Sequence, residues 1–288
     1  MRDDAGLRFR QGVETERPLQ VVGVINAYCA RLADRAGFRA LYLSGAGVAN
    51  ASFGLPDLGV TSLNDVLEDA RRITATTDLP LLVDCDTGWG SSLMIARTVR
   101  EMVRAKVAAI HLEDQVEQKR CGHRPGKHLV TTEAMVNRLK AAVDARSDDQ
   151  FVIMARTDAA ANEGVDAAIE RASRYVEAGA DMIFAEALTE PAQYRKFTSA
   201  IDVPVLANMT EFGRSPLLTV TELKELGVRL ALYPLTAFRA MSEAAAHVYN
   251  TVRFTGTQAS LLSTMQTREG LYEVLDYYNL EARLDREQ

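Results

Sequence analysis

Eight short apolar runs recur along the chain, and longer amphipathic segments separate them. The runs occupy residues 19–27, 40–45, 79–86, 108–114, 151–158, 182–187, 203–209 and 229–234. Each run is nearly continuous in apolar residues, which is typical of parallel strands buried on both faces. The intervening segments, such as 62–77, 92–106 and 131–147, have the spacing of amphipathic helices. This alternation predicts a parallel (β/α)8 TIM-type barrel, with a doubly wound open sheet as the alternative.

The two ends of the chain exceed a minimal barrel. Residues 1–18 are expected to form a short helix, with Phe9 and Val13 on one face because they are four apart. Two helical segments are expected after the last strand, as C-terminal helices that cover their own barrel or pack on another subunit. Their apolar positions are Val248, Val252, Leu261, Leu262, Leu271, Val274 and Leu275. No repeat or linker divides the chain, so we expect a single barrel domain over residues 1–288, with these helical additions.

Composition narrows the class of protein. A net charge of −6 argues against a general nucleic-acid or membrane surface, so an anionic small-molecule substrate would need arginines concentrated locally. Cys29, Cys85 and Cys121 are too few and too widely spaced for a disulfide framework. The N-terminus lacks the apolar core of a signal peptide, and no apolar run approaches the roughly 20 residues of a membrane span. We therefore expect a cytoplasmic protein.

Polar residues gather where the predicted strands end, which is where barrels of this type place their active sites. These residues are Tyr42, Ser44, Asp84, Asp86, His111, Glu113, Arg156, Asp158, Glu186, Asn208 and Thr210. Residues two apart on a strand share a face, so Asp84 should point into the same cavity as Asp86, and Cys85 should face away into packing. A single carboxylate at a strand end often only caps a helix, but six successive strands with polar ends indicate a site.

Converging carboxylates suit a hard divalent cation, and Mg²⁺ prefers oxygen ligands from a few carboxylates, waters and substrate. Asp84 and Asp86 are the best candidates, with Asp57, Glu113 or Glu186 in support. A zinc site that uses His111, His123 and His128 is the rival, but those histidines lack compact zinc-ligand spacing. The glycine-containing turn at residues 44–47 offers backbone N–H groups to a carboxylate.

The connection from Gln115 to Val130 is longer than the usual βα loop and carries a cysteine among cations. Lys119, Arg120, His123 and Arg124 all lie within three residues of Cys121. Neighbouring positive charge favours the thiolate form, which suits a general acid/base or a nucleophile. The alternative is a solvated basic loop in which the cysteine is incidental.

Several motifs together resemble the isocitrate lyase/phosphoenolpyruvate mutase superfamily. They are Lys-Arg-Cys-Gly-His at 119–123, Asp-Cys-Asp-Thr-Gly-Trp-Gly at 84–90 and Glu-Asp-Gln at 113–115. Their order and spacing agree over nearly the whole chain. The Cys-Gly-His element favours the carbon–carbon lyases, because phosphonate-forming and phosphonate-cleaving members lack it. Residues 208–213 resemble the branch that acts on 2-methylisocitrate, where leucine commonly replaces Met209.

True isocitrate lyases share the cysteine motif but are much longer chains. They also tend to have bulkier or more polar groups where Phe184, Leu232 and Pro234 stand in this sequence. Ala46 occupies a position where many relatives have glycine. This difference should matter little if the turn donates only backbone N–H groups.

The resemblance implies a Mg²⁺-dependent enzyme, with Mn²⁺ as an alternative metal, that cleaves 2-methylisocitrate to pyruvate and succinate. It implies Cys121 as general acid, and we choose Tyr42 as the base, with Arg156, His111 and Glu113 completing the catalytic set. The implied metal ligands are Asp84, Asp86 and Asp57. The implied substrate-binding residues are Ser44, Gly45, Ala46, Cys121, Gly122, Arg156, Glu186, Asn208, Met209, Thr210, Arg239 and Arg268.

Related acids remain open as substrates, because one methyl group in a pocket is worth only about 1–3 kcal/mol. Isocitrate, dimethylmalate and oxaloacetate are the alternatives, and a non-catalytic carboxylate-binding barrel is the alternative from another class. Members of the superfamily are usually homotetramers that exchange a C-terminal helix between subunits. Their cysteine loop closes over the substrate.

Overall fold

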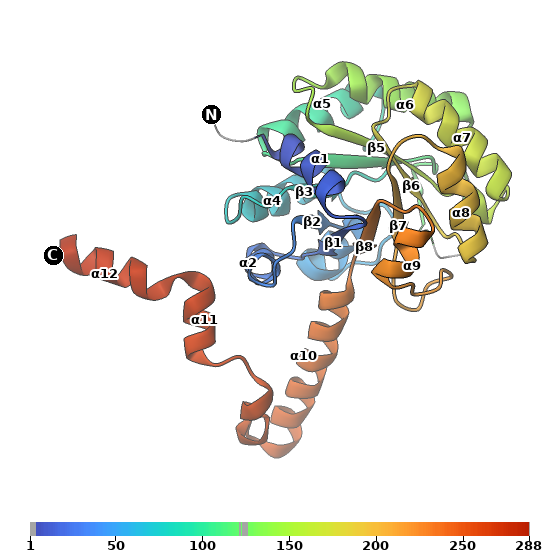
Figure 1. Cartoon of the computed structure of the whole chain (residues 1–288). Coiled ribbons are helices and arrows are strands. Elements are labelled where there is room, and N and C mark those ends of the chain that lie inside the picture. The colour runs from blue at the N-terminus through green and yellow to red at the C-terminus, as the bar shows by residue number, and fades with distance from the viewer. Residues whose placement is uncertain (1–3, 121, 123–125, 288) are drawn as a thin grey trace.

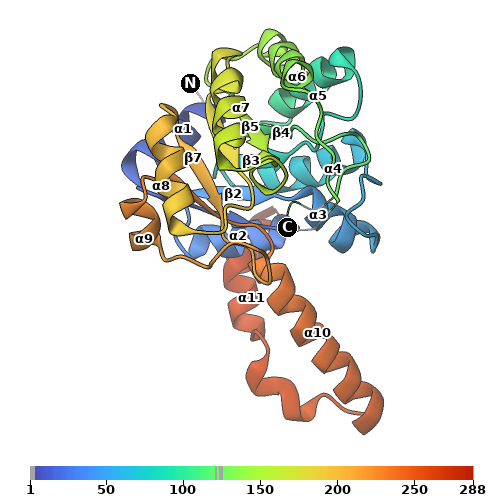
Figure 2. The same ribbon diagram turned by 90° about the vertical axis from the view of Figure 1, so that its right-hand side faces the viewer.

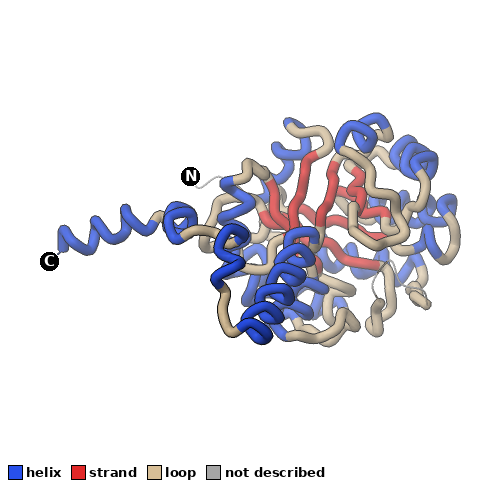
Figure 3. Tube along the Cα trace, turned by 90° about the horizontal axis from the view of Figure 1, so that it is seen from below, coloured by secondary structure: helices blue, strands red, loops and turns tan. Residues whose placement is uncertain are grey.

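The computed structural model in Figure 1 describes residues 4–120, 122 and 126–287. Eight parallel strands close into a barrel in sequential order, which Figure 3 shows from below. The strands are β1 (Leu19–Gly23), β2 (Ala40–Leu43), β3 (Leu81–Asp84), β4 (Ala109–Glu113), β5 (Val152–Thr157), β6 (Met182–Ala185), β7 (Val205–Asn208) and β8 (Leu230–Tyr233). The predicted barrel is confirmed, and the alternative of an open sheet is wrong because β1 pairs with β8.

Helices surround the barrel and connect its strands. They are α2 (Ala27–Arg35), α3 (Gly45–Gly47), the π-helix η1 (Val48–Ser52), α4 (Leu63–Thr74), α5 (Ser92–Arg104), α6 (Thr132–Ala145), the 3-10 helix η2 (Ala159–Ala161), α7 (Val165–Glu177), α8 (Pro191–Ala200) and α9 (Val220–Glu225). The three amphipathic segments predicted as helices coincide with α4, α5 and α6. The long connection between β4 and α6 is also present, and it carries the cysteine motif.

The strands bury two separate cores. The larger one lies between the strands and the surrounding helices, and it contains Val83 and Cys85. The second lies inside the barrel and contains Leu82, Met154 and Phe184. This alternation follows from the two-residue period of a strand. Cys85 is fully buried in the outer core, so its predicted role in packing is confirmed.

Helix α1 (Ala5–Thr15) covers the N-terminal end of the barrel, and it confirms the predicted leading helix. Phe9 and Val13 are buried in the core inside the barrel. Arg10 fixes the helix from outside, because its Nη2 lies 2.8 Å from Asp181 Oδ1 and its Nε donates to the Gln150 carbonyl at 3.0 Å. The apolar closure of this end leaves the C-terminal ends of the strands as the polar mouth of the barrel.

The C-terminal extension contains more elements than the two predicted helical segments. They are α10 (Thr236–Thr255), the 3-10 helix η3 (Ala259–Thr264), α11 (Arg268–Leu275) and α12 (Tyr277–Glu287). Figures 1 and 2 show α10 leaving the barrel, and none of its residues is buried. Helix α11 returns to α2, where Arg35 Nη2 lies 3.2 Å from Glu273 Oε2. Across the described part of the chain, no helix combines the length and apolarity needed to span a membrane.

Candidate active site

Strand pairing brings the polar side chains of the barrel mouth into register. Asp84 at the end of β3 is opposite His111 in β4, and Glu113 in β4 is opposite Arg156 in β5. All four side chains are buried, although they are titratable. Buried charges require partners, so their contacts indicate what this site is built to do.

Tyr42, His111 and Asp84 form a hydrogen-bonded row. The Tyr42 hydroxyl lies 2.9 Å from His111 Nε2, and it donates to Asp84 Oδ2 at 3.4 Å. Burial lowers the pKa of His111 to about 4, so this imidazole is neutral at pH 7. Burial, reinforced by the charge of Asp84, raises the pKa of Tyr42 well above its usual value. Tyr42 is therefore a hydrogen-bond donor in this arrangement, and His111 Nδ1 has no hydrogen-bond partner among the described residues.

Two of the three predicted metal ligands, Asp84 and Asp86, face one point beside Gly45. A Cβ added to this glycine would lie 3.1 Å from Asp86 Oδ1 and 3.2 Å from Asp84 Oδ2. Burial opposes ionisation of Asp84, but the interactions of Asp84 with His111 and with the cations Lys119 and Arg156 lower its pKa to about 2. Burial raises the pKa of Asp86 to about 7, although Lys119 opposes the shift. Two buried carboxylates over a bare glycine fit Mg²⁺, which takes one or two carboxylates and completes its shell with waters and substrate oxygens.

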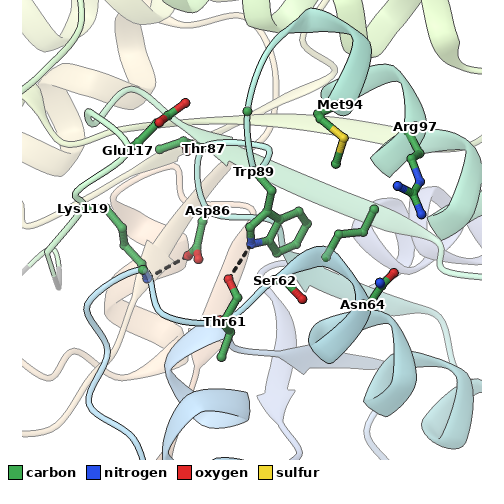
Figure 4. A pocket seen from close by; sticks show the side chains of 13 residues that line it. Thr61, Ser62, Asn64, Asp86, Thr87, Trp89, Met94, Arg97, Glu117 and Lys119 are labelled. Carbon is green, nitrogen blue, oxygen red and sulfur yellow. Dashed lines mark hydrogen bonds and ion pairs between the residues drawn. The ribbon is translucent and has the colours of Figure 1, made fainter.

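Lys119 stands among these carboxylates, as Figure 4 shows for its contact with Asp86. Its ammonium lies 2.7 Å from Asp86 Oδ1 and 2.5 Å from Asp57 Oδ1. Asp57 therefore contacts the lysine that binds Asp86. Within the described ranges, no three His, Cys, Asp or Glu side chains gather as a metal-binding group. Of the three predicted metal ligands, Asp84 and Asp86 therefore converge at Gly45, and Asp57 contacts Lys119.

A cavity of about 390 Å³ borders Asp86 and is drawn in Figure 4. Asp86 and Lys119 line it together with Trp89, Met94 and Arg97. The Trp89 indole donates to the Thr61 carbonyl at 3.1 Å, which fixes one wall. Of the predicted metal ligands, Asp86 therefore borders a space large enough for a small molecule.

Arg156 is the centre of a second buried cluster. Its Nε lies 3.0 Å from Asp158 Oδ2 and 3.4 Å from Glu113 Oε2, and its Nη2 lies 3.1 Å from Glu186 Oε2. The guanidinium also lies 4.9 Å from the centre of the Phe184 ring. Burial raises the pKa of Glu113 well above its usual value, with Arg156 opposing the shift. Glu113 Oε1 has no hydrogen-bond partner among the described residues, so the cluster retains an unused acceptor in the mouth.

Gly122 and β7 complete this cluster. A Cβ on Gly122 would lie 2.4 Å from Arg156 Nη2 and 2.5 Å from Glu186 Cγ, so any side chain there would force the loop or the guanidinium to move. Asn208 Nδ2 donates to Glu186 Oε2 at 3.2 Å. Thr210 is also buried at the same end of the barrel. The predicted residues Gly122, Arg156, Glu186 and Asn208 therefore share one cluster.

Four other predicted substrate-binding positions have local structural roles. Gly45 donates its N–H to Asp84 Oδ2 at 3.1 Å, so the turn at residues 44–47 does donate to a carboxylate, but to one of the protein itself. Ser44 is buried at the start of α3, and Ala46 lies within that helix. Met209 packs in the outer core, so its side chain faces the helix layer and away from the mouth.

Two predicted arginines lie outside the buried clusters. Arg239 belongs to α10, is 46% exposed, and has its Nε 3.6 Å from Glu211 Oε2. Arg268 is exposed at the start of α11, the helix of the C-terminal extension that returns to α2. Cys121 and His123 lie outside the described residues. Of the other two histidines in the rival zinc set, His111 is buried against Tyr42 and His128 is exposed.

Sequence reasoning did not assign a role to three charged residues of the mouth. The sequence places Lys119 in the basic loop and in the motif at 119–123 without indicating its partners, yet it contacts Asp57 and Asp86. Asp158 follows Arg156 by two residues, and this same-face spacing could have identified it as a partner. Lys127 binds Asp158 at 2.7 Å, and no local sequence signal indicates that contact.

Comparison with known proteins agrees with this arrangement. The sequence profile of the phosphoenolpyruvate phosphomutase family matches residues 9–253. The 2-methylisocitrate lyase of Shewanella oneidensis is 60% identical over 286 residues, which is 99% of this chain and 98% of that protein.

Solved structures show the same fold. A 2,3-dimethylmalate lyase, a member of the PEP mutase/isocitrate lyase superfamily, has a TM-score of 0.90 and 34% identity, covering 98% of this chain and 95% of that one. A phosphonopyruvate hydrolase solved with oxalate and Mg²⁺ has a TM-score of 0.85 and 28% identity, covering 96% of this chain and 97% of that one. The chain therefore belongs to the phosphoenolpyruvate mutase/isocitrate lyase superfamily and, within it, to the 2-methylisocitrate lyase family.

Proposed function

We propose that the chain cleaves 2-methylisocitrate to pyruvate and succinate at the C-terminal mouth of its barrel. The 60% identity to a 2-methylisocitrate lyase over nearly the whole length supports this substrate. The observation that carries the chemistry is the pair of carboxylate oxygens of Asp84 and Asp86 that face one point at Gly45. The same mouth holds the Arg156 cluster, which suits a substrate with several carboxylates.

The reaction is a retro-aldol-type cleavage between the hydroxyl-bearing carbon and its neighbour. The hydroxyl proton must leave as the ketone of pyruvate forms, and the electron pair of the broken bond passes to the other fragment. That fragment becomes a carbanion stabilised as an aci-carboxylate, and a proton delivered to carbon gives succinate. The site must therefore supply a base, stabilisation of negative charge and an acid.

Asp84 and Asp86 would hold Mg²⁺ in this proposal. Asp57 would support the site through Lys119, which contacts both Asp57 and Asp86. When bound, Mg²⁺ supplies a Lewis acid for the hydroxyl and carboxylate oxygens of the substrate. A phosphonopyruvate hydrolase of the same fold, solved with oxalate and Mg²⁺, supports this choice of metal. The bare backbone of Gly45 supports it too, because a side chain there would fill the space between the two carboxylates.

Tyr42 would take the hydroxyl proton, and Cys121 would deliver a proton to the carbanion. Tyr42 is protonated at rest, so it would accept the hydroxyl proton as it passes its own phenol proton to Nε2 of the neutral His111, 2.9 Å away. Cys121 lies outside the described residues. Its neighbour Gly122 packs against Arg156 and Glu186, which supports a role for this part of the loop at the site.

Arg156 would bind a substrate carboxylate, because its planar fork pairs two-pronged with carboxylates. Glu186, Asn208 and Thr210 surround this arginine or lie at the same end of the barrel. The backbone N–H groups of residues 44–46 would contribute at the metal side. Arg239 and Arg268 would close the site from the C-terminal helices.

We also propose that the chain forms a homotetramer that exchanges a C-terminal helix between subunits. Large apolar side chains that a partner would bury are exposed on the extension: Tyr249, Val252, Phe254, Leu262, Leu280 and Leu284. Such an exchange would bring Arg268 to the barrel mouth of a neighbouring subunit. In a single chain Arg268 is exposed, and its position there does not explain a role in substrate binding. Light scattering of the full chain that gives a monomer mass at micromolar concentration would contradict this assembly.

The decisive assay measures pyruvate and succinate released from 2-methylisocitrate, with and without EDTA. The proposal requires both products in equal amounts and loss of turnover on chelation, with recovery when Mg²⁺ is added. Isocitrate, dimethylmalate and oxaloacetate serve as competing substrates. A higher kcat/KM for any of them would replace the proposed substrate.

Two variants test the roles and exclude a barrel that only binds carboxylates. Cys121→Ser should retain Mg²⁺ and succinate binding but lose nearly all turnover. Asp86→Ala should weaken Mg²⁺ binding in calorimetry, whereas Asp69→Ala, which removes another buried carboxylate that contacts Arg72, should not. Unchanged Mg²⁺ affinity in Asp86→Ala would remove Asp86 from the ligand set, and a fully active Cys121→Ser would remove the proposed acid.

A further inference from the structure

Lys127 lies in the loop between β4 and α6, and its ammonium is buried. Its side chain is only 1% exposed. The ammonium donates to the Gly122 carbonyl at 2.6 Å and to Asp158 Oδ1 at 2.7 Å. Asn162 Nδ2 donates to the Lys127 carbonyl at 2.9 Å, so the lysine backbone is also fixed. A buried ammonium is costly unless it is paired, so these two acceptors define where Lys127 must stay.

The carboxylate that Lys127 binds is the one that orients Arg156. Asp158 is fully buried, and both of its oxygens accept from Arg156, at 3.0 Å from Nε and 3.3 Å from Nη2. Its backbone N–H donates to Asp114 Oδ1 at 2.9 Å, which anchors it to β4. One carboxylate thus connects Arg156 with Lys127. The geometry of the arginine and that of the loop are therefore linked through Asp158.

The other acceptor of Lys127 is the backbone next to the cysteine. Gly122 has no side chain to hold it, and it packs where a Cβ would lie 2.4 Å from Arg156 Nη2. On the other side of Cys121 in the sequence, Gln115 forms two hydrogen bonds with the backbone of Arg120. Gln115 Nε2 donates to the Arg120 carbonyl at 2.8 Å, and the Arg120 N–H donates to Gln115 Oε1 at 2.9 Å. The residues before and after Cys121 are therefore each held by a side chain of the same loop.

We propose that Lys127 is a positioning residue for the lyase reaction, which holds the Gly122 backbone on the Arg156–Glu186 pair through a shared contact with Asp158. This inference rests on the proposed function for the reaction that it serves. A lysine suits the task because its compact ammonium carries three donors that can reach a carbonyl and a carboxylate together. Without it, Gly122 would regain the backbone freedom of glycine and lose its fixed place on Arg156.

Lys127→Met tests the proposal, because it keeps the length of the side chain and removes the donors and the charge. We expect kcat to fall by about 10- to 100-fold, as for other residues that orient a reacting group, with KM changed by less than about threefold. Hydrogen exchange of peptides covering residues 115–130 should accelerate at Gly122 without any ligand present. Lys127→Arg, which keeps charge and donors, should recover part of kcat and part of the protection.

Arg146→Met is the matched control. Arg146 Nη1 also donates to one carbonyl and one carboxylate, the Phe151 carbonyl at 3.1 Å and Asp181 Oδ2 at 2.8 Å, but it does so before β5 and β6. Its removal should lower the unfolding midpoint and leave kcat unchanged. Lys127→Gln, which keeps two N–H donors but no charge, replaces Lys127→Met if that variant does not fold.

The outcomes separate this inference from the proposed function. An inactive wild-type chain would refute the proposed function, and hydrogen exchange would still report whether Lys127 holds Gly122. An active wild type with equal kcat in Lys127→Met, or unchanged exchange at Gly122, would refute the positioning role. A rise in KM larger than the fall in kcat would also refute it, because Lys127 would then act on substrate binding through Arg156.

Discussion

Gly122→Ala gives the sharpest test of the site, because the structure fixes the size of the perturbation. The added Cβ would lie 2.4 Å from Arg156 Nη2, whereas ordinary contact begins at 3.4 Å. Either the loop or the guanidinium must therefore move by about 1 Å. Arg156 has charged contacts to Asp158, Glu186 and Glu113, at 3.0, 3.1 and 3.4 Å. The Gly122 carbonyl has a single contact of this kind, with Lys127.

The loop should move, because hydrogen bonds to charged groups contribute about 1.5–3 kcal/mol each and Arg156 has more of them. A misplacement of about 1 Å at a reacting group can cost about 100-fold in rate, which equals about 2.7 kcal/mol in the activation barrier. We expect kcat/KM of Gly122→Ala to fall by about 100-fold. The free energy of unfolding should change by less than about 1 kcal/mol, since the barrel stays intact.

The assay is steady-state pyruvate release, paired with urea unfolding of the same preparations. Gly12→Ala in α1 is the control, because its Cβ would meet only the flexible end of Leu19, at 3.3 Å, at the opposite end of the barrel. It should keep full activity. A Gly122→Ala variant within threefold of wild-type kcat/KM would refute the packing of Gly122 on Arg156. A large loss of stability would show instead that the buried cluster had moved.

Three further predictions concern stability. Phe9→Ala should lower the free energy of unfolding by about 3–5 kcal/mol in urea titrations, because Phe9 fills the closed end of the barrel. Phe53, which is 48% exposed, should tolerate alanine. Similar losses of stability for the two variants would contradict this prediction. Gly23→Ala should abolish soluble folded protein in expression tests, since its Cβ would lie 1.7 Å from the Pro234 carbonyl oxygen where β1 meets β8. A folded Gly23→Ala variant would show that this junction can shift. Hydrogen bonds from the backbone N–H and the hydroxyl of Thr219 lower the pKa of Glu222. The stability that Glu222 contributes to the folded protein is therefore fully present above pH 4.5, its usual pKa, and is lost as the pH falls further. The unfolding midpoint of wild type should therefore exceed that of Glu222→Ala near pH 7, and the difference should shrink below pH 4.5; a difference that grows in acid would contradict the sign.

The elements of the fold were predictable because their signals are local. A strand buried on both faces needs a short apolar run, and an amphipathic helix needs its own period, so neighbouring residues suffice to identify both. The inward direction of Asp84 and the outward direction of Cys85 follow from the same two-residue period. The C-terminal extension was less predictable, because its division into α10, η3, α11 and α12 depends on short turns with weak signals.

Residue motifs in the sequence determined the family, and the comparisons confirmed it. The gathering of Tyr42, His111 and Arg156 also followed from the rule that strand ends meet at one mouth. Which cation binds which carboxylate did not follow, because it depends on how a long loop folds back onto the closed barrel. Only the tertiary structure placed Lys119 between Asp57 and Asp86, and Lys127 between Gly122 and Asp158. A buried charge takes the partners that packing brings within about 3 Å, and those partners are distant in sequence.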